Sequence, residues 1–300
     1  MNSGDSARVV VLGDVITDVL VRMREPLNPA SDTDSDIAIR AGGSGANLAS
    51  WLAITGQEVH FVGGLGEDAF ANFHQAEFEH YRVIPHLSVD KTLPTGSIVA
   101  LIDAEGERSM LTDRGANLAV KFEDLPLQLF RPGNYFHLSG YMLFEEKTRE
   151  IALAALRLAH QRQMFTSVDP SSVALLAKVG PEQFLKWTEG VTCCFPNLDE
   201  GRLLSGESDP EKIAGFLVSW YDNVALKLGA AGALGEGKHQ PPVVYPAEAV
   251  KVVDTTGAGD AFGAGFLASW IKKQDFKQAL ATGVHFGSMV VSQVGARPPH

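Results

Sequence analysis

Short runs of apolar, often β-branched residues alternate with longer helical patterns along most of the 300-residue chain. The first pair is a strand at Arg8–Gly13 and a helix at Ser44–Thr55, and the second is a strand at Glu58–Val62 and a helix at Asp68–Tyr81. Strands that alternate with helices predict a mostly parallel sheet with helices on both faces. The expected fold class is therefore α/β and doubly wound, with ligands beyond the carboxyl ends of the strands.

The same alternation continues to the end of the chain. Later strands are predicted at Tyr135–Leu138, Phe165–Val168, Val191–Phe195 and Val224–Leu228, and later helices at Glu145–Gln161, Pro181–Trp187, Leu198–Leu204, Pro210–Trp220, Gly257–Lys272 and Phe276–Gln293. A length of 300 residues fits one large domain, or one domain with a small appendage.

Two stretches interrupt the alternation. Met23–Arg40 is polar and contains a DTDSD run, and Thr95–Thr112 predicts a β-hairpin with its turn at Ala104–Glu107. Strand-like segments outside the alternating pattern indicate a second, smaller sheet, such as a lid. We expect a single domain over residues 1–300, with the lid formed from segments within 18–40 and 95–112.

The composition excludes several classes of protein. The net charge is −11 and no run is rich in Lys or Arg, which argues against a nucleic-acid partner. No stretch approaches the roughly 20 apolar residues of a membrane span, and the apolar run near the N-terminus is too short for a signal peptide. The two cysteines, Cys193 and Cys194, are adjacent and predict a buried strand in a reducing compartment. A cytoplasmic protein is expected.

Three glycine-rich loops are candidates for phosphate binding. The first, Gly232–His239, nearly matches the phosphate-binding loop of nucleotide hydrolases, but His239 replaces the hydroxyl residue that would hold Mg²⁺. Pro241 and Pro242 follow at once, so no helix can begin there. We predict a hairpin turn at this loop.

The second loop, Gly64–Ala69 (GLGEDA), has the outline of a dinucleotide-binding turn, and Asp90 follows about 20 residues later. However, the loop follows the second predicted strand instead of the first. Glu67 and Asp68 also stand where a pyrophosphate would lie. A short glycine pattern is weak evidence by itself, and a dehydrogenase stays a rival hypothesis.

The third loop, Asp254–Phe266 (DTTGAGDAFGAGF), carries the strongest pattern. Thr255 or Thr256 is predicted to cap a helix, and the glycines after them let a ligand approach the backbone closely. The free N–H groups at the start of this helix and the helix dipole together predict an anion site, formed by Gly257, Ala258 and Gly259.

Asp260 is the only charged residue in the otherwise apolar helix Gly257–Ile271. A carboxylate at the mouth of a buried helix, beside an anion site, is costly unless the protein uses it. We therefore interpret Asp260 as functional. The alternative is that it only complements the helix dipole.

In these motifs the chain resembles the ribokinase-like (PfkB) family of sugar and nucleoside kinases. Two signature regions match, Ala41–Phe73 (AGGSGANLASWLAITGQEVHFVGGLGEDAFANF) and Asp254–Trp270 (DTTGAGDAFGAGFLASW). Between them stand an N-x-x-E element, Asn197–Glu200, and a glycine turn, Gly229–Gly232. The matches cover nearly the whole chain in the family order.

The resemblance implies a doubly wound sheet with a small β lid. It also implies transfer of the γ-phosphoryl group of ATP to a hydroxyl, usually primary, of a sugar or sugar derivative. In that family pattern Asp260 takes the hydroxyl proton, and the N–H groups of Ala258, Gly259 and Asp260 hold the phosphoryl oxygens, beside Gly257. Asn197 and Glu200 resemble the residues that organise Mg²⁺, through water.

The resemblance further implies acceptor contacts at Asp18, Gly43 and Asn47, whose donors and acceptors suit paired sugar hydroxyls. Arg114 is a further acceptor-binding candidate. The alternative to acceptor binding is, for Asn47, a hydrogen bond at the start of its own helix. For Arg114 the alternative is a position on the surface. Ribokinases commonly have lysine where Ser44 stands, and an asparagine is missing two residues before Asp18, which weakens ribose as the acceptor.

The nucleotide contacts implied by the resemblance are Lys227, Gly229, Gly232 and Thr256. The alternative interpretation of Lys227 is that it is a surface lysine at the end of a strand, with no role in nucleotide binding. Asp254, with Thr256, matches part of a site for a monovalent cation such as K⁺.

Two other functions stay open, a nucleoside kinase of the same family and a regulator that has lost catalysis. Intact Asp260, Asn197 and Glu200 argue against the regulator. The expected partner is a small sugar or nucleoside. The predicted hairpin places Ile98, Ala100 and Ile102 on one face, which needs a cover, and a homodimer through the lid is expected.

Overall fold

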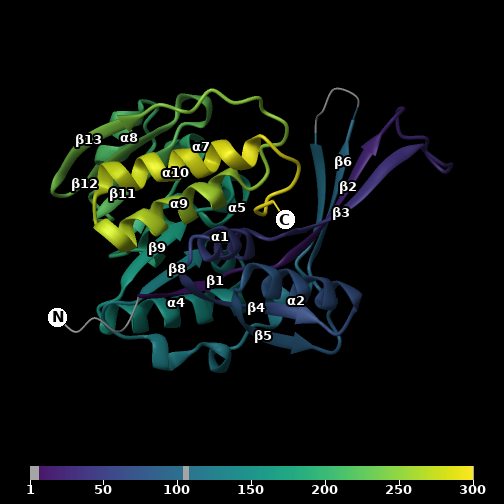
Figure 1. The fold of residues 1–300 in the computed structure, drawn as a ribbon, viewed down its shortest axis with the longest axis horizontal. Coiled ribbons are helices and arrows are strands. Elements are labelled where there is room, and N and C mark those ends of the chain that lie inside the picture. The colour runs from purple at the N-terminus through teal and green to yellow at the C-terminus, as the bar shows by residue number, and fades with distance from the viewer. Residues whose placement is uncertain (1–6, 104–107, 300) are drawn as a thin grey trace.

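The structure is a computed structural model that describes residues 7–103 and 108–299 and contains two sheets (Figure 1). The larger sheet has nine strands in the order β13-β12-β11-β10-β9-β8-β1-β4-β5. They are β1 (Arg8–Leu12), β4 (Glu58–Gly66), β5 (Ile84–Asp90), β8 (Tyr135–Ser139), β9 (Phe165–Asp169), β10 (Cys193–Cys194), β11 (Asn223–Lys227), β12 (Ala233–Gly237) and β13 (Gln240–Tyr245). The seven strands from β11 to β5 pair in parallel, and β12 and β13 are antiparallel, which confirms the predicted α/β sheet.

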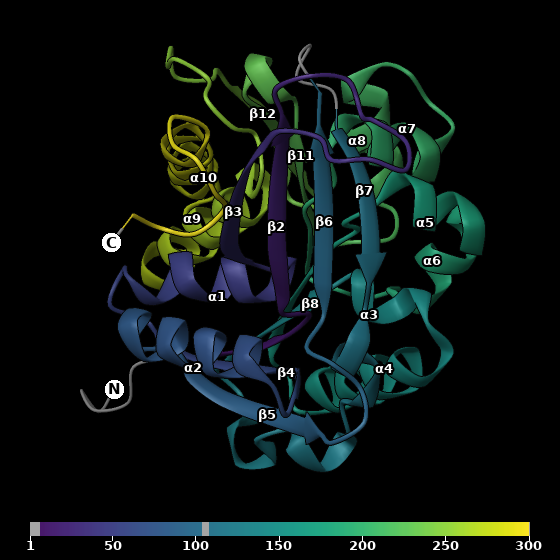
Figure 2. The same ribbon diagram turned by 90° about the vertical axis from the view of Figure 1, so that its right-hand side faces the viewer.

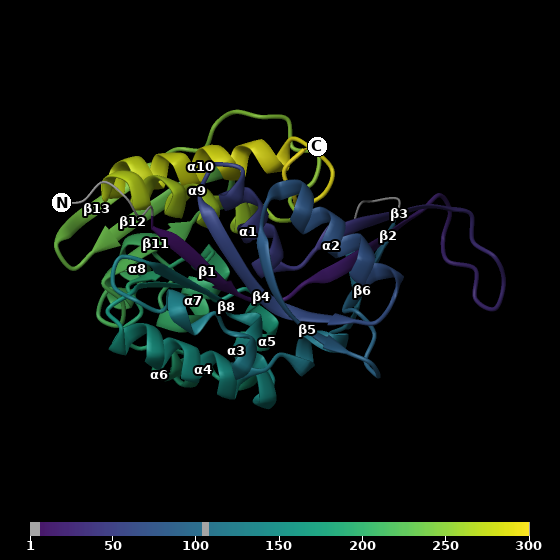
Figure 3. The same ribbon diagram turned by 60° about the horizontal axis from the view of Figure 1, so that its bottom comes forward.

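Helices cover both faces of this sheet, as Figure 3 shows. One layer holds α1 (Ser44–Ala53), α2 (Ala69–Tyr81), α9 (Ala258–Lys273) and α10 (Phe276–Val291). The other holds α3 (Tyr141–Phe144), α4 (Glu146–Gln161), α5 (Val173–Val179), α6 (Pro181–Trp187), α7 (Leu198–Ser205) and α8 (Pro210–Leu217). The doubly wound architecture follows from strands that are apolar on both sides, as in a parallel sheet buried between two helical layers.

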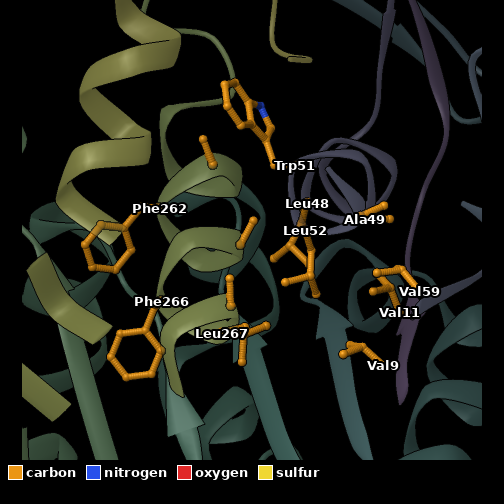
Figure 4. Packing of buried hydrophobic residues seen from close by; sticks show 14 of the residues in the cluster. Val9, Val11, Leu48, Ala49, Trp51, Leu52, Val59, Phe262, Phe266 and Leu267 are labelled. Atoms are coloured by element: carbon orange, nitrogen blue, oxygen red, sulfur yellow. The ribbon is translucent and has the colours of Figure 1, made fainter. Parts of the chain in front are cut away.

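The central strand β1 contributes to both cores. Val9 and Val11 pack in the core with α1 and α9, whereas Val10 and Leu12 pack in the opposite core. Successive side chains of a strand point to opposite faces, which explains the division. Figure 4 shows the first of these cores, where side chains of α1 and α9 meet above β1.

Helix α9 is buried from Ala261 to Ser269, as its apolar sequence predicts. A Cβ atom at Gly263 would lie 3.0 Å from Leu48 Cδ1 of α1, and one at Gly265 would lie 2.6 Å from the Thr282 carbonyl oxygen of α10. The glycines of this helix therefore allow its two neighbours to pack closely. This close packing fixes the position of its N-terminus.

The smaller sheet is the predicted lid and has the order β3-β2-β6-β7 (Figures 1 and 2). Its strands are β2 (Ile16–Met23), β3 (Ser35–Gly42), β6 (Ser97–Ile102) and β7 (Arg108–Asp113). Strands β6 and β7 form the predicted antiparallel hairpin, and the predicted turn at Ala104–Glu107 lies outside the described residues.

Both faces of the lid carry apolar side chains, which the sequence did not predict. The residues Ile98, Ala100 and Ile102 share one face, but Val99 and Leu101 lie on the other. There Val99 is paired with Val19 of β2 and Leu111 of β7, and Val19 is paired with Ile39 of β3. The face that carries Val19, Val99 and Leu111 is the more apolar of the two, because Ile98 and Ile102 on the other face are paired with Asp18 and Arg22.

Several sequence predictions need correction. Strand β10 has only two residues instead of Val191–Phe195, α8 ends at Leu217 instead of Trp220, and β5 and α5 were not predicted. The predicted hairpin turn at Gly232–His239 is only partly correct, because Ala233–Gly237 forms strand β12 and the turn to β13 is limited to Lys238 and His239. No helix in the described residues has the length and apolar character that a membrane span requires.

The dehydrogenase hypothesis is wrong, because Gly64 and Gly66 lie inside β4 and do not form a turn. A Cβ atom at Gly64 would come within 2.0 Å of the Ala116 carbonyl oxygen. These glycines therefore allow close packing against the segment after β7.

Candidate active site

The N-terminus of α9 lies at the end of a left-handed turn. Gly257 has φ 78° and is the N-cap residue, and a Cβ atom there would lie 2.7 Å from Ala296 Cα. The prediction that Thr255 or Thr256 caps the helix is wrong. Thr256 instead donates from its N–H and its hydroxyl to Asp254 Oδ1, at 2.9 and 2.7 Å, since a charged carboxylate is the stronger acceptor.

The first turn of α9 presents backbone donors. The N–H of Ala258 donates to the Thr255 carbonyl oxygen at 3.3 Å, so this donor is already partly used. The N–H groups of Gly259 and Asp260 belong to the first turn, where an α-helix offers no preceding carbonyl group. Together with the positive end of the helix dipole, they favour an anion.

Asp260 is held by two side chains of α1. Ser44 Oγ donates to Asp260 Oδ1 at 2.8 Å, and Asn47 Nδ2 donates to Asp260 Oδ2 at 2.9 Å. Burial is the main cause that raises the pKa of Asp260 to about 7, and nearby Asp169 adds to it, while the two hydrogen bonds oppose it. A carboxyl group whose pKa lies near neutral pH is suited to accept a proton.

One polar atom of the Asn47 side chain makes no hydrogen bond within the described residues. Its Oδ1 atom is buried and has no hydrogen-bond partner among the described residues. The alternative for Asn47, a helix-start hydrogen bond, is wrong, because its side chain reaches Asp260. A buried carbonyl oxygen without a donor is costly, and a hydroxyl beside Asp260 would satisfy it.

Lys227 and Asp169 form a buried ion pair at the carboxyl ends of β11 and β9. The distance from Lys227 Nζ to Asp169 Oδ2 is 2.5 Å. The side chains are 13% and 8% exposed, so the alternative of a surface lysine is wrong. A Cβ atom at Gly259 would lie 2.9 Å from Lys227 Nζ, which puts the ammonium group against the first turn of α9.

Asn197 and Glu200 cap the start of α7, because the side chain of each residue accepts a hydrogen bond from the backbone N–H of the other. Asn197 Oδ1 accepts from the Glu200 N–H at 2.9 Å, and Glu200 Oε2 accepts from the Asn197 N–H at 2.8 Å. The pair is thus a capping box, but Glu200 is only 1% exposed. Burial, followed by the nearby Asp169 carboxylate, raises the pKa of Glu200 to about 7, and the Lys227 ammonium group opposes this shift.

Asp18 and Gly43 lie at the junction of the lid and α1. Gly43 has φ 91°, and a Cβ atom there would lie 2.6 Å from the Asp14 carbonyl oxygen. Asp18 packs against Gly42, where a Cβ atom would lie 2.2 Å from its Oδ2 atom. Burial, followed by nearby Asp14, raises the pKa of Asp18 to about 7, and Arg297 opposes this shift.

Arg114 follows β7 and is mostly buried, so its alternative surface position is wrong. Its guanidinium carbon lies 4.8 Å from the centroid of the Tyr141 ring, and its Nη1 atom lies 3.6 Å from Asp14 Oδ2. Gly229 and Gly232, at φ 59° and 96°, shape the turn between β11 and β12. At Gly232 a Cβ atom would lie 2.0 Å from the Tyr245 carbonyl oxygen, so only glycine fits.

Asp254 accepts hydrogen bonds on both carboxylate oxygens. Besides the two bonds from Thr256 to Oδ1, the N–H of Gly295 donates to Oδ2 at 3.2 Å. The carboxylate therefore joins the loop before α9 to the segment after α10.

Asp14 and Asp169 were missed from the sequence. Both lie at the carboxyl edge of the sheet. Asp14 stands two residues after the end of β1, and Asp169 is the last residue of β9. That position is where ligands bind in such folds, so it was the signal that could have found both residues.

Comparisons with known proteins agree with this geometry. Residues 6–300 match the family described as pfkB family carbohydrate kinase. The chain belongs to the pfkB family of carbohydrate kinases. This kinase is 31% identical to aminoimidazole riboside kinase of Salmonella typhimurium, over 85% of this chain and 83% of the relative.

Two further similarities extend the family assignment. The kinase is 28% identical to ATP-dependent ribose-1-phosphate kinase of Halopiger xanaduensis, over 97% of this chain and 94% of the relative. Its fold is that of adenosine kinase from Sinorhizobium meliloti, with a TM-score of 0.89, 22% identity and coverage of 99% and 97% of the two chains. The ribokinase-like fold with a lid is therefore confirmed.

Proposed function

We propose that this kinase transfers the γ-phosphoryl group of ATP to a hydroxyl, usually primary, of a sugar or sugar derivative, with Asp260 as the base. The observation that carries the proposal is that Asn47 Oδ1 has no hydrogen-bond partner in the described part of the chain, while Nδ2 of the same side chain donates to the Asp260 carboxylate. Asp260 lies in the first turn of α9, where the N–H groups of Gly259 and Asp260 have no preceding helical carbonyl group. One rigid element thus offers an acceptor for a hydroxyl proton and donors for a phosphoryl group.

In the proposed reaction the acceptor hydroxyl donates to Asp260, while Ser44 and Asn47 hold the carboxylate in place. The hydroxyl oxygen bonds to the γ-phosphorus, the bond from that phosphorus to the β,γ-bridging oxygen breaks, and the proton passes to Asp260. The leaving group is ADP. The N–H groups of Ala258, Gly259 and Asp260, with Lys227 beside Gly259, stabilise the charge on the phosphoryl oxygens.

Mg²⁺ is proposed to lie near Asn197 and Glu200, held through water. The residues fit a hydrated Mg²⁺, because the carboxylates of Glu200 and Asp169 both lie near Lys227 and a divalent cation would add to the positive charge that Lys227 supplies. When bound, the ion neutralises phosphate charge. A monovalent cation such as K⁺ is proposed at Asp254, whose two carboxylate oxygens accept hydrogen bonds from Thr256 and Gly295.

The remaining proposals concern organisation and partners. Residues 1–300 are proposed to form one kinase domain with its lid, in the cytoplasm, and the net charge of −11 argues against binding to nucleic acid. A homodimer is proposed through the lid face that carries Val19, Val99 and Leu111. On that face Ile37, Ile39 and Leu111 are 66%, 47% and 61% exposed, and a second lid would bury them.

The dimer is tested by light scattering at micromolar concentration, with Ile39→Asp as the variant. The parent is expected to be a dimer and the variant a monomer. Phe216→Asp, at an exposed apolar position on α8, is the control and should not change the mass. A monomeric parent would contradict the proposal.

An ADP-release screen tests the proposed function over pentoses, hexoses, sugar acids and nucleosides. Turnover of a sugar is expected. Turnover of nucleosides alone would support the alternative of a nucleoside kinase, which the similarity to an aminoimidazole riboside kinase also favours. No turnover of any acceptor would favour a regulator without catalysis.

A further inference from the structure

A pocket lies between the lid, α2 and the segment that follows α10. Its volume is about 380 Å³, which is within the range of small-molecule sites. The walls are residues 39–41 of β3, Phe73, Glu77 and Tyr81 on one face of α2, and residues 293–299. None of the residues proposed to contact the acceptor, the nucleotide or a cation lines it. The pocket is therefore separate from the candidate active site.

Arg297 lines this pocket and is buried with most of its donors unused. The residue is 6% exposed, and its guanidinium carbon lies 5.3 Å from the centroid of the Phe78 ring. Its Nη2 atom donates to the Gly42 carbonyl oxygen at 3.3 Å, whereas Nε and Nη1 have no hydrogen-bond partner in the described part of the chain. A buried cation with unused donors is costly, so the guanidinium group requires a further acceptor.

The charged side chains that line the pocket sum to one net positive charge. They are Arg40 and Arg297 on one side of the balance and Glu77 on the other. Burial lowers the pKa of Arg297 to about 10, and nearby Glu77 and Asp18 oppose this shift, so the guanidinium group stays charged at neutral pH. Asp18 does not line the pocket, and its own pKa is raised to about 7 by burial. A single negative charge would therefore balance the pocket.

Much of the remaining wall is apolar, with Ile39, Phe73, Val294 and two prolines. One cation with unused donors among apolar side chains suits a ligand that has an anionic head and an apolar body. A carboxylate carries one negative charge, whereas a phosphate monoester carries about 1.5 to 2 at pH 7. The second charge would meet Glu77 without a further cation beside Arg297, so the charge balance favours a carboxylate.

We propose that this pocket is a binding site for a small organic monocarboxylate, whose carboxylate pairs with Arg297 and whose apolar part packs against Phe73 and Val294. The inference goes beyond the proposed function and does not rest on it, because the pocket shares no residue with the candidate active site. Binding is measured without turnover.

Calorimetric titration of the whole chain with three probes tests the proposal. Benzoate combines a carboxylate with an apolar ring, benzamide keeps the shape without the charge, and acetate keeps the charge without the ring. Benzoate should bind at one site per chain. Benzamide and acetate should each bind at least about tenfold more weakly, because each lacks one of the two interactions. A saturating non-hydrolysable ATP analogue should not displace benzoate, whereas displacement would place benzoate in the anion site of α9 and overturn the proposal.

Variants locate the site. Val294 is 55% exposed, so Val294→Asp should fold, and its charge should weaken benzoate binding at least about tenfold by like-charge repulsion. Val89→Asp is the matched control, because Val89 lies on β5, outside the pocket, and is also 55% exposed. It should keep the parent affinity. Arg297→Gln should abolish the preference for benzoate over benzamide, and Glu77→Gln should strengthen benzoate binding.

The outcomes keep this inference apart from the proposed function. Equal affinity for benzoate and benzamide in the parent, or parent affinity for benzoate in Val294→Asp, overturns the carboxylate site while the kinase function stands. If Arg297→Gln does not fold, Val294→Asp and the comparison of probes in the parent decide the question. The absence of ADP release with every acceptor overturns the proposed function and leaves the carboxylate site in place.

Discussion

The two sides of the site each hold a buried cation beside a carboxylate, but the two pairs differ in geometry. On the nucleotide side Lys227 Nζ lies 2.5 Å from Asp169 Oδ2, and on the acceptor side Arg114 Nη1 lies 3.6 Å from Asp14 Oδ2. We call the first pair closed, because its two atoms are within hydrogen-bond distance, and the second pair open, because its two atoms are not. The groups proposed to bind phosphate are thus already paired with each other, whereas the groups proposed to bind the acceptor have unused hydrogen-bonding capacity.

The difference follows from the elements that carry each pair. Lys227 and Asp169 end strands β11 and β9, which flank β10 in the central sheet. Arg114 follows β7 of the lid, and Asp14 lies between β1 and β2, where the chain passes from the central sheet to the lid. Groups on sheet strands are positioned rigidly, while connecting segments tolerate change and often carry specificity.

The largest effect is expected at the point where both sides meet, at Asp260. Asp260→Asn keeps size and polarity but cannot accept the proton, so kcat should fall by roughly 10²–10⁴, as is typical for loss of a general base. Melting temperature above pH 7 should hold or rise, because a half-buried carboxylate is removed. A variant that keeps more than half of the parent kcat would show that Asp260 only complements the helix dipole.

The pH dependence sharpens the same prediction. Because the pKa of Asp260 is raised to about 7, the carboxylate is protonated below neutral pH and kcat should fall as the pH drops below 7. Stability should change in the opposite direction. A carboxyl group with a raised pKa binds its proton more tightly when folded, so its contribution to stability is lost as the pH rises toward 7. Asp260→Asn should remove both effects, and a parent rate that is flat from pH 5 to 8 would contradict the assignment.

Breaking the closed pair should affect stability as well as ATP binding. Lys227→Met leaves Asp169 buried without its cation, which should lower the free energy of unfolding by roughly 3–5 kcal/mol. The KM for ATP should rise while the KM for the acceptor stays near that of the parent. Adding Asp169→Asn to Lys227→Met should restore much of the stability but not the KM for ATP, and recovery of both would show that Lys227 does not meet the nucleotide.

Glu200→Gln tests the magnesium assignment. It should raise the Mg²⁺ concentration needed for half-maximal activity and lower turnover, because a neutral side chain attracts the hydrated ion less. The fold should persist, since the glutamine oxygen can still accept from the Asn197 N–H in the capping box. Asp199→Asn, next to Glu200 but exposed, is the control. An unchanged Mg²⁺ dependence would mean that the pair serves only to cap α7.

The smallest effect is expected on the open side. Asp18→Ala and Asn47→Ala should weaken acceptor binding by roughly 0.5–1.5 kcal/mol for each neutral hydrogen bond, and more where the charged Asp18 takes part. ATP binding should change much less. Titration calorimetry with each substrate measures both, and equal losses for the two substrates would indicate damage to the fold.

Local patterns in the sequence determined much of this protein. The buried helix α9, the hairpin of the lid and the parallel sheet were predicted correctly, since apolar periodicity and turn chemistry act over a few residues, while the roles of Asp260, Asn47 and Lys227 stay predictions. The cap of α9 was predicted wrongly, because a left-handed glycine and a carboxylate acceptor took the roles expected of the threonines.

Only the tertiary structure decided which side chains meet. The bonds from Ser44 and Asn47 to Asp260 join residues 216 and 213 positions apart in the chain. The contact of Asp14 with Arg114 and the pair of Lys227 with Asp169 also depend on the strand order of the two sheets and on close packing at glycines. Periodicity shows which face of an element is buried but not which element covers it, and the chemistry of this site arises from that second choice.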